Sequence, residues 1–120
     1  MEIEVGEYVR TKNGIIDKVE NYSIGCCVWH CQNGMCIDKC NCIGTHLEDI
    51  VKHSKNKVEL VEAGDYVNGW KVLAKTKTKN NEMKVCILTS FEDEHWITIN
   101  NETLKTIVTK ESFKEREYVF

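Results

Sequence analysis

Apolar and polar residues alternate along most of the chain, and this pattern predicts short β-strands. It is clearest at Ile15–Tyr22 and in two later runs, Trp70–Thr78 and Glu82–Thr89, which can form a hairpin across residues 79–81. Shorter strands are expected at residues 25–30, 58–61, 95–99, 103–108 and 117–120. Helical signals are confined to Thr45–Val51 and Thr109–Arg116, where a threonine can cap a short helix. The pattern therefore predicts six to eight short strands and one or two helical turns.

Two segments of the chain repeat one motif. VGEYV at residues 5–9 is followed by Asn13-Gly14, and AGDYV at residues 63–67 is followed by Asn68-Gly69. Asn-Gly tolerates positive φ and is a strong hairpin signal, so each copy should form a hairpin. Two copies are too few for a solenoid. We expect them to be two equivalent corners of one small barrel or rolled sheet.

Composition strengthens the β prediction. Val, Ile and Thr occupy 12, 11 and 9 of the 120 positions, while Leu occupies 5 and Ala only 2. Branching at Cβ favours pleated sheet over helix. The predicted fold is thus mainly β, a small SH3-like barrel or rolled antiparallel sheet with one or two short helices. At this length a single domain over residues 1–120 is expected.

The segments VGEYVRTKNG, IVKHSKN, EAGDYVNGWKV and TIVTKESFKEREY together resemble a family of small proteins from phages and prophages of low-GC Gram-positive bacteria. The resemblance covers residues 1–21 and 48–120. The cysteine-rich stretch lies outside it, and we interpret residues 31–44 as a loop insertion. The VGEYV and AGDYVNG units are also similar to the first hairpin of SH3-like barrels, a similarity compatible with many functions.

The resemblance implies a phage accessory protein that acts by binding, in the cytoplasm of the infected bacterial host. Such proteins often block a host defence system, so we expect an inhibitor of a CRISPR effector or of another defence protein. An alternative is a sponge that sequesters a nucleotide immune signal. Nothing in the residues separates these two hypotheses.

A third alternative, a nucleic-acid-binding SH3-like module, depends on charge. The net charge is −3, and only two of the sixteen basic residues are arginine. Odd-numbered lysines from Lys71 to Lys79 would share one strand face and form a basic stripe. The more ordinary interpretation of that stripe is a solvated strand face.

The cysteines are the strongest chemical signal. Six of the seven fall between residues 26 and 42. Cys27, Cys31, Cys36 and Cys40 could wrap one structural zinc ion, with Cys26, Cys42, His30 and His46 as substitutes. The spacing contains no C-x-x-C, so free thiols or disulfides are the competing interpretations.

A second candidate site is an acidic segment between aromatic residues. Glu92, Asp93 and Glu94 precede Trp96, and with Trp70 they could form a partner-binding surface or imitate phosphates. The competing interpretation is a solvated acidic turn with Trp96 in the core.

The sequence lacks the motifs of the common enzyme classes. Neither G-x-S-x-G, G-x-x-x-x-G-K-[ST], H-E-x-x-H nor G-x-G-x-x-G occurs. We therefore expect no enzymatic activity, and rank a zinc- or thiol-dependent reaction last. No apolar run approaches the length of a membrane span, and the N-terminus has acids where a signal peptide needs bases.

Overall fold

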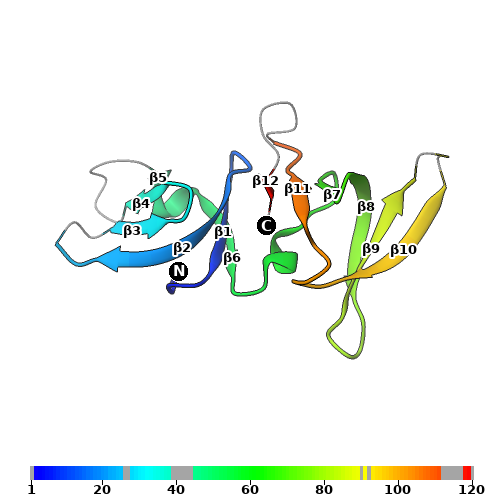
Figure 1. Ribbon diagram of the computed structural model, residues 1–120, viewed down its shortest axis with the longest axis horizontal. Coiled ribbons are helices and arrows are strands. Elements are labelled where there is room, and N and C mark those ends of the chain that lie inside the picture. Colours follow the sequence, from blue (N-terminus) through cyan, green and yellow to red (C-terminus); the bar gives the residue numbers. More distant parts are fainter. Residues whose placement is uncertain are drawn as a thin grey trace. The chain divides into compact units, whose positions relative to one another are not determined.

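The computed structural model describes residues 2–25, 28–38, 45–89, 91, 93–111 and 118–119. These residues form two compact units, 1–55 and 56–120, each built on its own six-stranded sheet (Figure 1). The mainly β fold expected from the sequence is confirmed. The two hairpins, however, belong to two separate sheets, and the expectation that they form two equivalent corners of one small barrel or rolled sheet is wrong. The SH3-like topology and the single folding domain stay predictions.

The sheet of residues 1–55 has the strand order β5-β4-β3-β2-β1-β6. Its strands are β1 (Tyr8–Thr11), β2 (Ile16–Ser23), β3 (Val28–Cys31), β4 (Cys36–Asp38), β5 (Thr45–His46) and β6 (Ile50–Ser54). All neighbours are antiparallel except β4 and β5. The core includes Val9, Val19, Trp29 and Ile37.

The sheet of residues 56–120 has the order β10-β9-β8-β7-β11-β12. Its strands are β7 (Tyr66–Val67), β8 (Trp70–Lys77), β9 (Met83–Leu88), β10 (Glu94–Ile99), β11 (Thr106–Val108) and β12 (Tyr118–Val119). Every pair in it is antiparallel. Its buried apolar side chains include Val67, Val72, Val85, Ile99 and Ile107.

The two sequence repeats fold in the same way. Gly6 and Gly64 have φ of 96° and 98°, a conformation that favours glycine over residues with a Cβ. Gly6 N donates to Val19 O, and Gly64 N donates to Val72 O, at 2.8 Å in both cases. The equivalent bonds fix the start of each hairpin, so the repeat encodes a local structure that is used twice.

Several predicted elements differ from the structure. Residues 58–61 were expected as a strand, but Lys57–Leu60 form the 3-10 helix η2. The helical turn expected at Thr45–Val51 is only the 3-10 helix η1 (Leu47–Asp49), and its N-cap residue is His46 rather than the expected Thr45. It ends at Asp49 because Ile50 already pairs with β1 as the first residue of β6. The predicted loop insertion over residues 31–44 contains strand β4. The helix expected at 109–116 falls mostly outside the described residues.

Candidate functional site

Strand β10 is the outermost strand of its sheet (Figure 1). Its first residues are exposed. Trp96 lies opposite Cys86 on β9, which in turn lies opposite Ala74 on β8. The alternate residues Ile97 and Ile99 pair with the buried Val85 and Met83, so they take the core side of the strand. Trp96 is therefore on the other side and remains 54% exposed. The competing interpretation, which placed Trp96 in the core, is wrong.

Acidic residues precede this tryptophan, and Glu94, two residues earlier on β10, takes the same side of the strand. Asp93 and Glu94 are exposed, and the backbone amide of Thr89 donates to Asp93 O at 2.9 Å. Phe91 is 85% exposed at the same end of the strand. We call Phe91, Asp93, Glu94 and Trp96 the β10 surface. Glu92, which the sequence also assigned to this site, lies outside the described residues.

Trp70 belongs to a different surface. It lies opposite Val67 on β7. The next residue, Lys71, lies opposite Leu88 on β9, and Leu88 lies opposite Glu94 on β10, so Lys71 shares the face of Glu94. Since neighbouring residues of a strand point to opposite faces, Trp70 is on the sheet face away from Glu94 and Trp96. Trp70 is 38% exposed there. The predicted partner surface is thus divided, with Trp70 on one face and Glu94 and Trp96 on the other.

The predicted lysine stripe is interrupted. A register shift between Val72 and Ala74 places Lys71 on the opposite face from Lys75 and Lys77. Lys75 Nζ donates to Val61 O at 2.7 Å, and Lys77 Nζ lies 2.6 Å from Glu59 Oε1. Two of the lysines are therefore held by the protein itself, and Lys71, Lys75 and Lys77 do not share the one strand face that the basic-stripe hypothesis requires.

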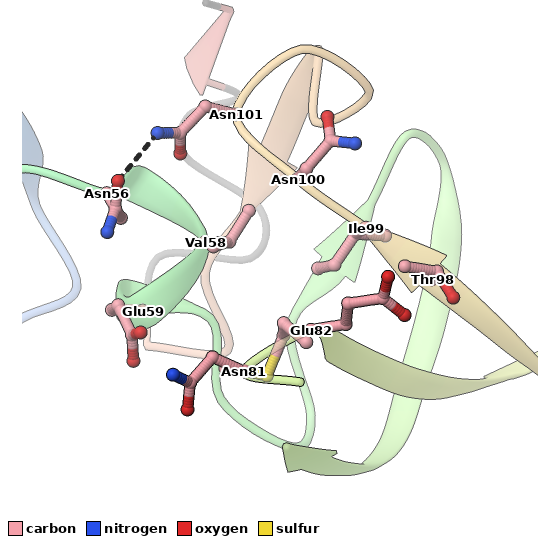
Figure 2. A pocket seen from close by; sticks show the side chains of 10 residues that line it. Asn56, Val58, Glu59, Asn81, Glu82, Thr98, Ile99, Asn100 and Asn101 are labelled. Carbon is pink, nitrogen blue, oxygen red and sulfur yellow. Dashed lines mark hydrogen bonds between the residues drawn. The ribbon is translucent and has the colours of Figure 1, made fainter. Parts of the chain in front are cut away.

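A hollow in the 56–120 unit is lined by amides and carboxylates (Figure 2). Asn101 Nδ2 donates to Asn56 Oδ1 at 3.0 Å on one side of it. The remaining lining residues are Val58, Glu59, Asn81, Glu82, Met83, Thr98, Ile99 and Asn100. None of these is lysine, arginine or an aromatic residue, the side chains that a nucleotide phosphate and base would require. Two carboxylates would repel a phosphate.

The cysteines of the predicted zinc site separate into two environments. Cys31 is buried in the core beside Val19, and burial, assisted by Asp17, raises the pKa of its thiol to about 12. Cys36 is half-buried on β4, with its Sγ 3.6 Å from His30 Nδ1. His30 and Cys36 share one face of the β3–β4 hairpin, and Cys31 takes the other.

The four other cysteines of the predicted zinc site, Cys26, Cys27, Cys40 and Cys42, lie outside the described residues. His46 lies at the start of η1, where its backbone amide donates to Asp49 Oδ2 at 3.3 Å. Within residues 2–25, 28–38 and 45–89, and the shorter described segments after them, three or more metal-ligating side chains do not meet. The zinc ion stays a prediction.

A carboxylate–imidazole pair lies in the 1–55 unit and was not foreseen. Glu7 Oε1 lies 3.0 Å from His53 Nδ1, and Glu7 Oε2 accepts a bond from Glu4 N at 2.6 Å. Ser54 follows His53 on β6 and therefore faces the other side of the sheet. Ser54 therefore does not extend the pair, and we assign the pair to folding. An acid at the same position of both sequence repeats, Glu7 and Asp65, is the sequence signal that could have indicated the structural role of Glu7.

Comparison with known proteins adds no assignment. No family model matches the chain, and neither a curated protein nor a solved structure matches it. In the part of the chain that the structure describes, no helix has the length and apolar character needed to cross a membrane.

Proposed function

We propose that the protein is a non-enzymatic phage accessory protein that inhibits a bacterial defence effector, of the CRISPR nuclease type, by binding it through the β10 surface. The observation that carries the proposal is the half-exposed Trp96 on an edge strand, next to Asp93 and Glu94. Tryptophan is the residue type most enriched in the energetic centre of protein interfaces. The protein would act in the cytoplasm of the infected host.

Charge indicates the kind of partner. Asp93 and Glu94 are both exposed, and acidic residues at one end of an aromatic anchor fit a basic groove with a pocket for the ring. Effectors that bind nucleic acid have such grooves, because they must hold a phosphate backbone. Competition for that groove would inhibit the effector without any chemical turnover.

The two alternatives have less support. A nucleotide sponge needs cationic and aromatic side chains around one hollow, whereas the hollow in Figure 2 is lined by asparagine, glutamate, threonine and aliphatic side chains. A nucleic-acid-binding module needs a free basic face, whereas Lys75 and Lys77 contact Val61 and Glu59. Both alternatives remain outcomes of the test below.

The test is a phage-plating assay in a bacterium that carries CRISPR immunity. Wild-type protein should restore plating, and so should Trp70→Ala, whose ring lies on the opposite face of the sheet. Trp96→Ala should fail to restore it while keeping the circular dichroism spectrum of the wild type. Failure of the wild-type protein against every CRISPR type tried, or full activity of Trp96→Ala, would overturn the proposal.

Native mass spectrometry of the active protein separates the alternatives. A bare chain or a chain with metal fits the proposal. A bound nucleotide would replace it with the sponge, and a stable complex with DNA or RNA alone would replace it with the nucleic-acid-binding module.

A further inference from the structure

His30 and Cys36 face each other across the β3–β4 hairpin. The two residues are direct register partners, and Cys36 Sγ lies 3.6 Å from His30 Nδ1. Both side chains are half-buried, so they are held in place yet reachable from solvent. The hairpin turn between them is closed by bonds from Cys31 N to Met35 O at 2.9 Å and from Gly34 N to Cys31 O at 3.1 Å. The backbone therefore fixes the pair.

The sulfur–nitrogen separation is the one that a shared zinc ion would impose. Zinc binds sulfur at about 2.3 Å and imidazole nitrogen at about 2.0–2.1 Å, and a tetrahedral angle between these bonds places the two ligand atoms about 3.6 Å apart. The observed Sγ–Nδ1 distance is 3.6 Å. The distance between the two ligand atoms therefore already matches that of a shared tetrahedral metal ion.

We propose that Cys36 Sγ and His30 Nδ1 are two ligands of a zinc ion bound at the β3–β4 hairpin. Thiolate and imidazole together suit zinc and exclude the hard cations magnesium and calcium. On binding, the Cys36 thiol releases its proton to solvent, and His30 is neutral with its remaining ring proton on Nε2. Zinc affinity should consequently fall as the pH is lowered.

This site differs from the set expected from spacing alone. Cys31 was one of four first-choice ligands, but it lies on the core face of β3 among apolar side chains. His30 takes its place, because it is the neighbour that points to the face of Cys36. Further thiols flank the hairpin in the sequence, at Cys26 and Cys27 before β3 and at residues 40 and 42 after β4. The proposal rests on His30 and Cys36 alone.

Cobalt(II) titration of the full, reduced chain tests the proposal. Cobalt replaces zinc in tetrahedral sites and gives visible absorption bands that report its geometry. The wild-type protein should show these bands and lose them when zinc is added. His30→Ala and Cys36→Ser should each weaken binding by more than about tenfold, since even groups that only hydrogen-bond to a metal ligand contribute that much.

Matched controls use the same residue types at other places. His95→Ala removes an exposed histidine of β10, and Cys31→Ala removes the cysteine on the opposite face of β3; both should bind cobalt like the wild type. Circular dichroism establishes that each variant is folded. The proposal is overturned if the folded wild type binds no cobalt, if both ligand variants keep wild-type affinity, or if Cys31→Ala loses as much affinity as Cys36→Ser.

Discussion

Glu7 and Asp65 accept equivalent hydrogen bonds in the two turns that precede strands β1 and β7. Glu7 Oε2 accepts from Glu4 N at 2.6 Å, and Asp65 Oδ2 accepts from Glu62 N at 2.8 Å. In both cases an acid at the end of a four-residue turn bonds back to the first residue of that turn. The carboxylates are almost completely buried, so each is a structural acceptor whose loss leaves a backbone donor unsatisfied.

Asp65→Ala should therefore destabilise the protein by about 1–3 kcal/mol, the usual cost of leaving a buried hydrogen-bonding group unpaired. Asp65 Oδ1 also accepts from Lys110 N at 3.0 Å, so two donors lose their partner. Urea unfolding measures the effect. Glu102→Ala, at an exposed turn position, is the control and should change stability by less than about 0.5 kcal/mol. Equal stability of the two variants would contradict the structural role of Asp65.

Alanine variants of Gly64 and Gly6 separate the effect of backbone strain on stability from the effect of steric crowding. Both have positive φ, so alanine at either position should cost about 1 kcal/mol or more in unfolding free energy. At Gly64 an added Cβ would also lie 3.2 Å from Lys110 Cδ, whereas at Gly6 it meets nothing within 4 Å. Gly64→Ala should thus be the more destabilising of the two in thermal or urea unfolding.

Gly25 is the control for these two variants. Its φ lies outside the positive range, and an added Cβ meets nothing within 4 Å. Gly25→Ala should leave stability unchanged or slightly raised, because alanine restricts the unfolded chain. If Gly25→Ala lowered the free energy of unfolding more than Gly64→Ala, backbone conformation would not determine the effect of alanine at these glycines.

The Lys12–Asp49 ion pair predicts a pH dependence. Lys12 Nζ lies 2.8 Å from Asp49 Oδ1, and this bond lowers the pKa of Asp49 from 3.8 and raises the pKa of Lys12 from 10.5. On the acid side, the stabilisation by the ion pair is fully present above pH 3.8 and is lost as the pH falls through the lowered pKa of Asp49. On the alkaline side, it is fully present below pH 10.5 and is lost as the pH rises through the raised pKa of Lys12.

An NMR titration of the Asp49 carboxyl group checks this sign. In Lys12→Met the pKa of Asp49 should return towards 3.8. The effect on global stability should be small, because water screens an exposed pair. An Asp49 pKa that does not respond to removal of Lys12 would contradict the ion pair.

Cys31 should resist alkylation in the folded protein. Its pKa of about 12 keeps the thiol protonated at neutral pH, and thiols react as thiolates. In protein freed of metal with a chelator, iodoacetamide should modify the half-buried Cys36 in native buffer and Cys31 only after unfolding in urea, and peptide mass spectrometry identifies the modified residue. Labelling of Cys31 in native buffer as fast as Cys36 would contradict its place in the core.

The sequence predicted the β class and the hairpins well, because Asn68-Gly69 and its counterpart dictate local turns whatever surrounds them. It did not predict that the copies begin separate sheets, since strand partners are chosen by long-range packing. Lys57–Leu60 carries a strand-like apolar pattern, yet forms a 3-10 helix that buries Val58 and Leu60. Short apolar runs have this ambiguity.

The partner surface could be predicted only in part. Exposed acids at residues 93 and 94 follow from polarity, but the exposure of Trp96 depends on which alternate residues of β10 face the core. Ile97 and Ile99 take that side because they pair with Val85 and Met83. Trp70 was assigned to the same surface, and only the register of β7, β8 and β9 shows that it lies on the other face.

Calorimetric titration of the purified defence effector with three proteins is the most direct test of the central claim, that Trp96 anchors the partner. Trp70→Ala should bind like the wild type. Trp96→Ala should bind about 30-fold more weakly or worse, the loss typical of truncating a hot-spot aromatic. Equal affinity of Trp96→Ala and wild type for an effector that the wild type inhibits would contradict the account.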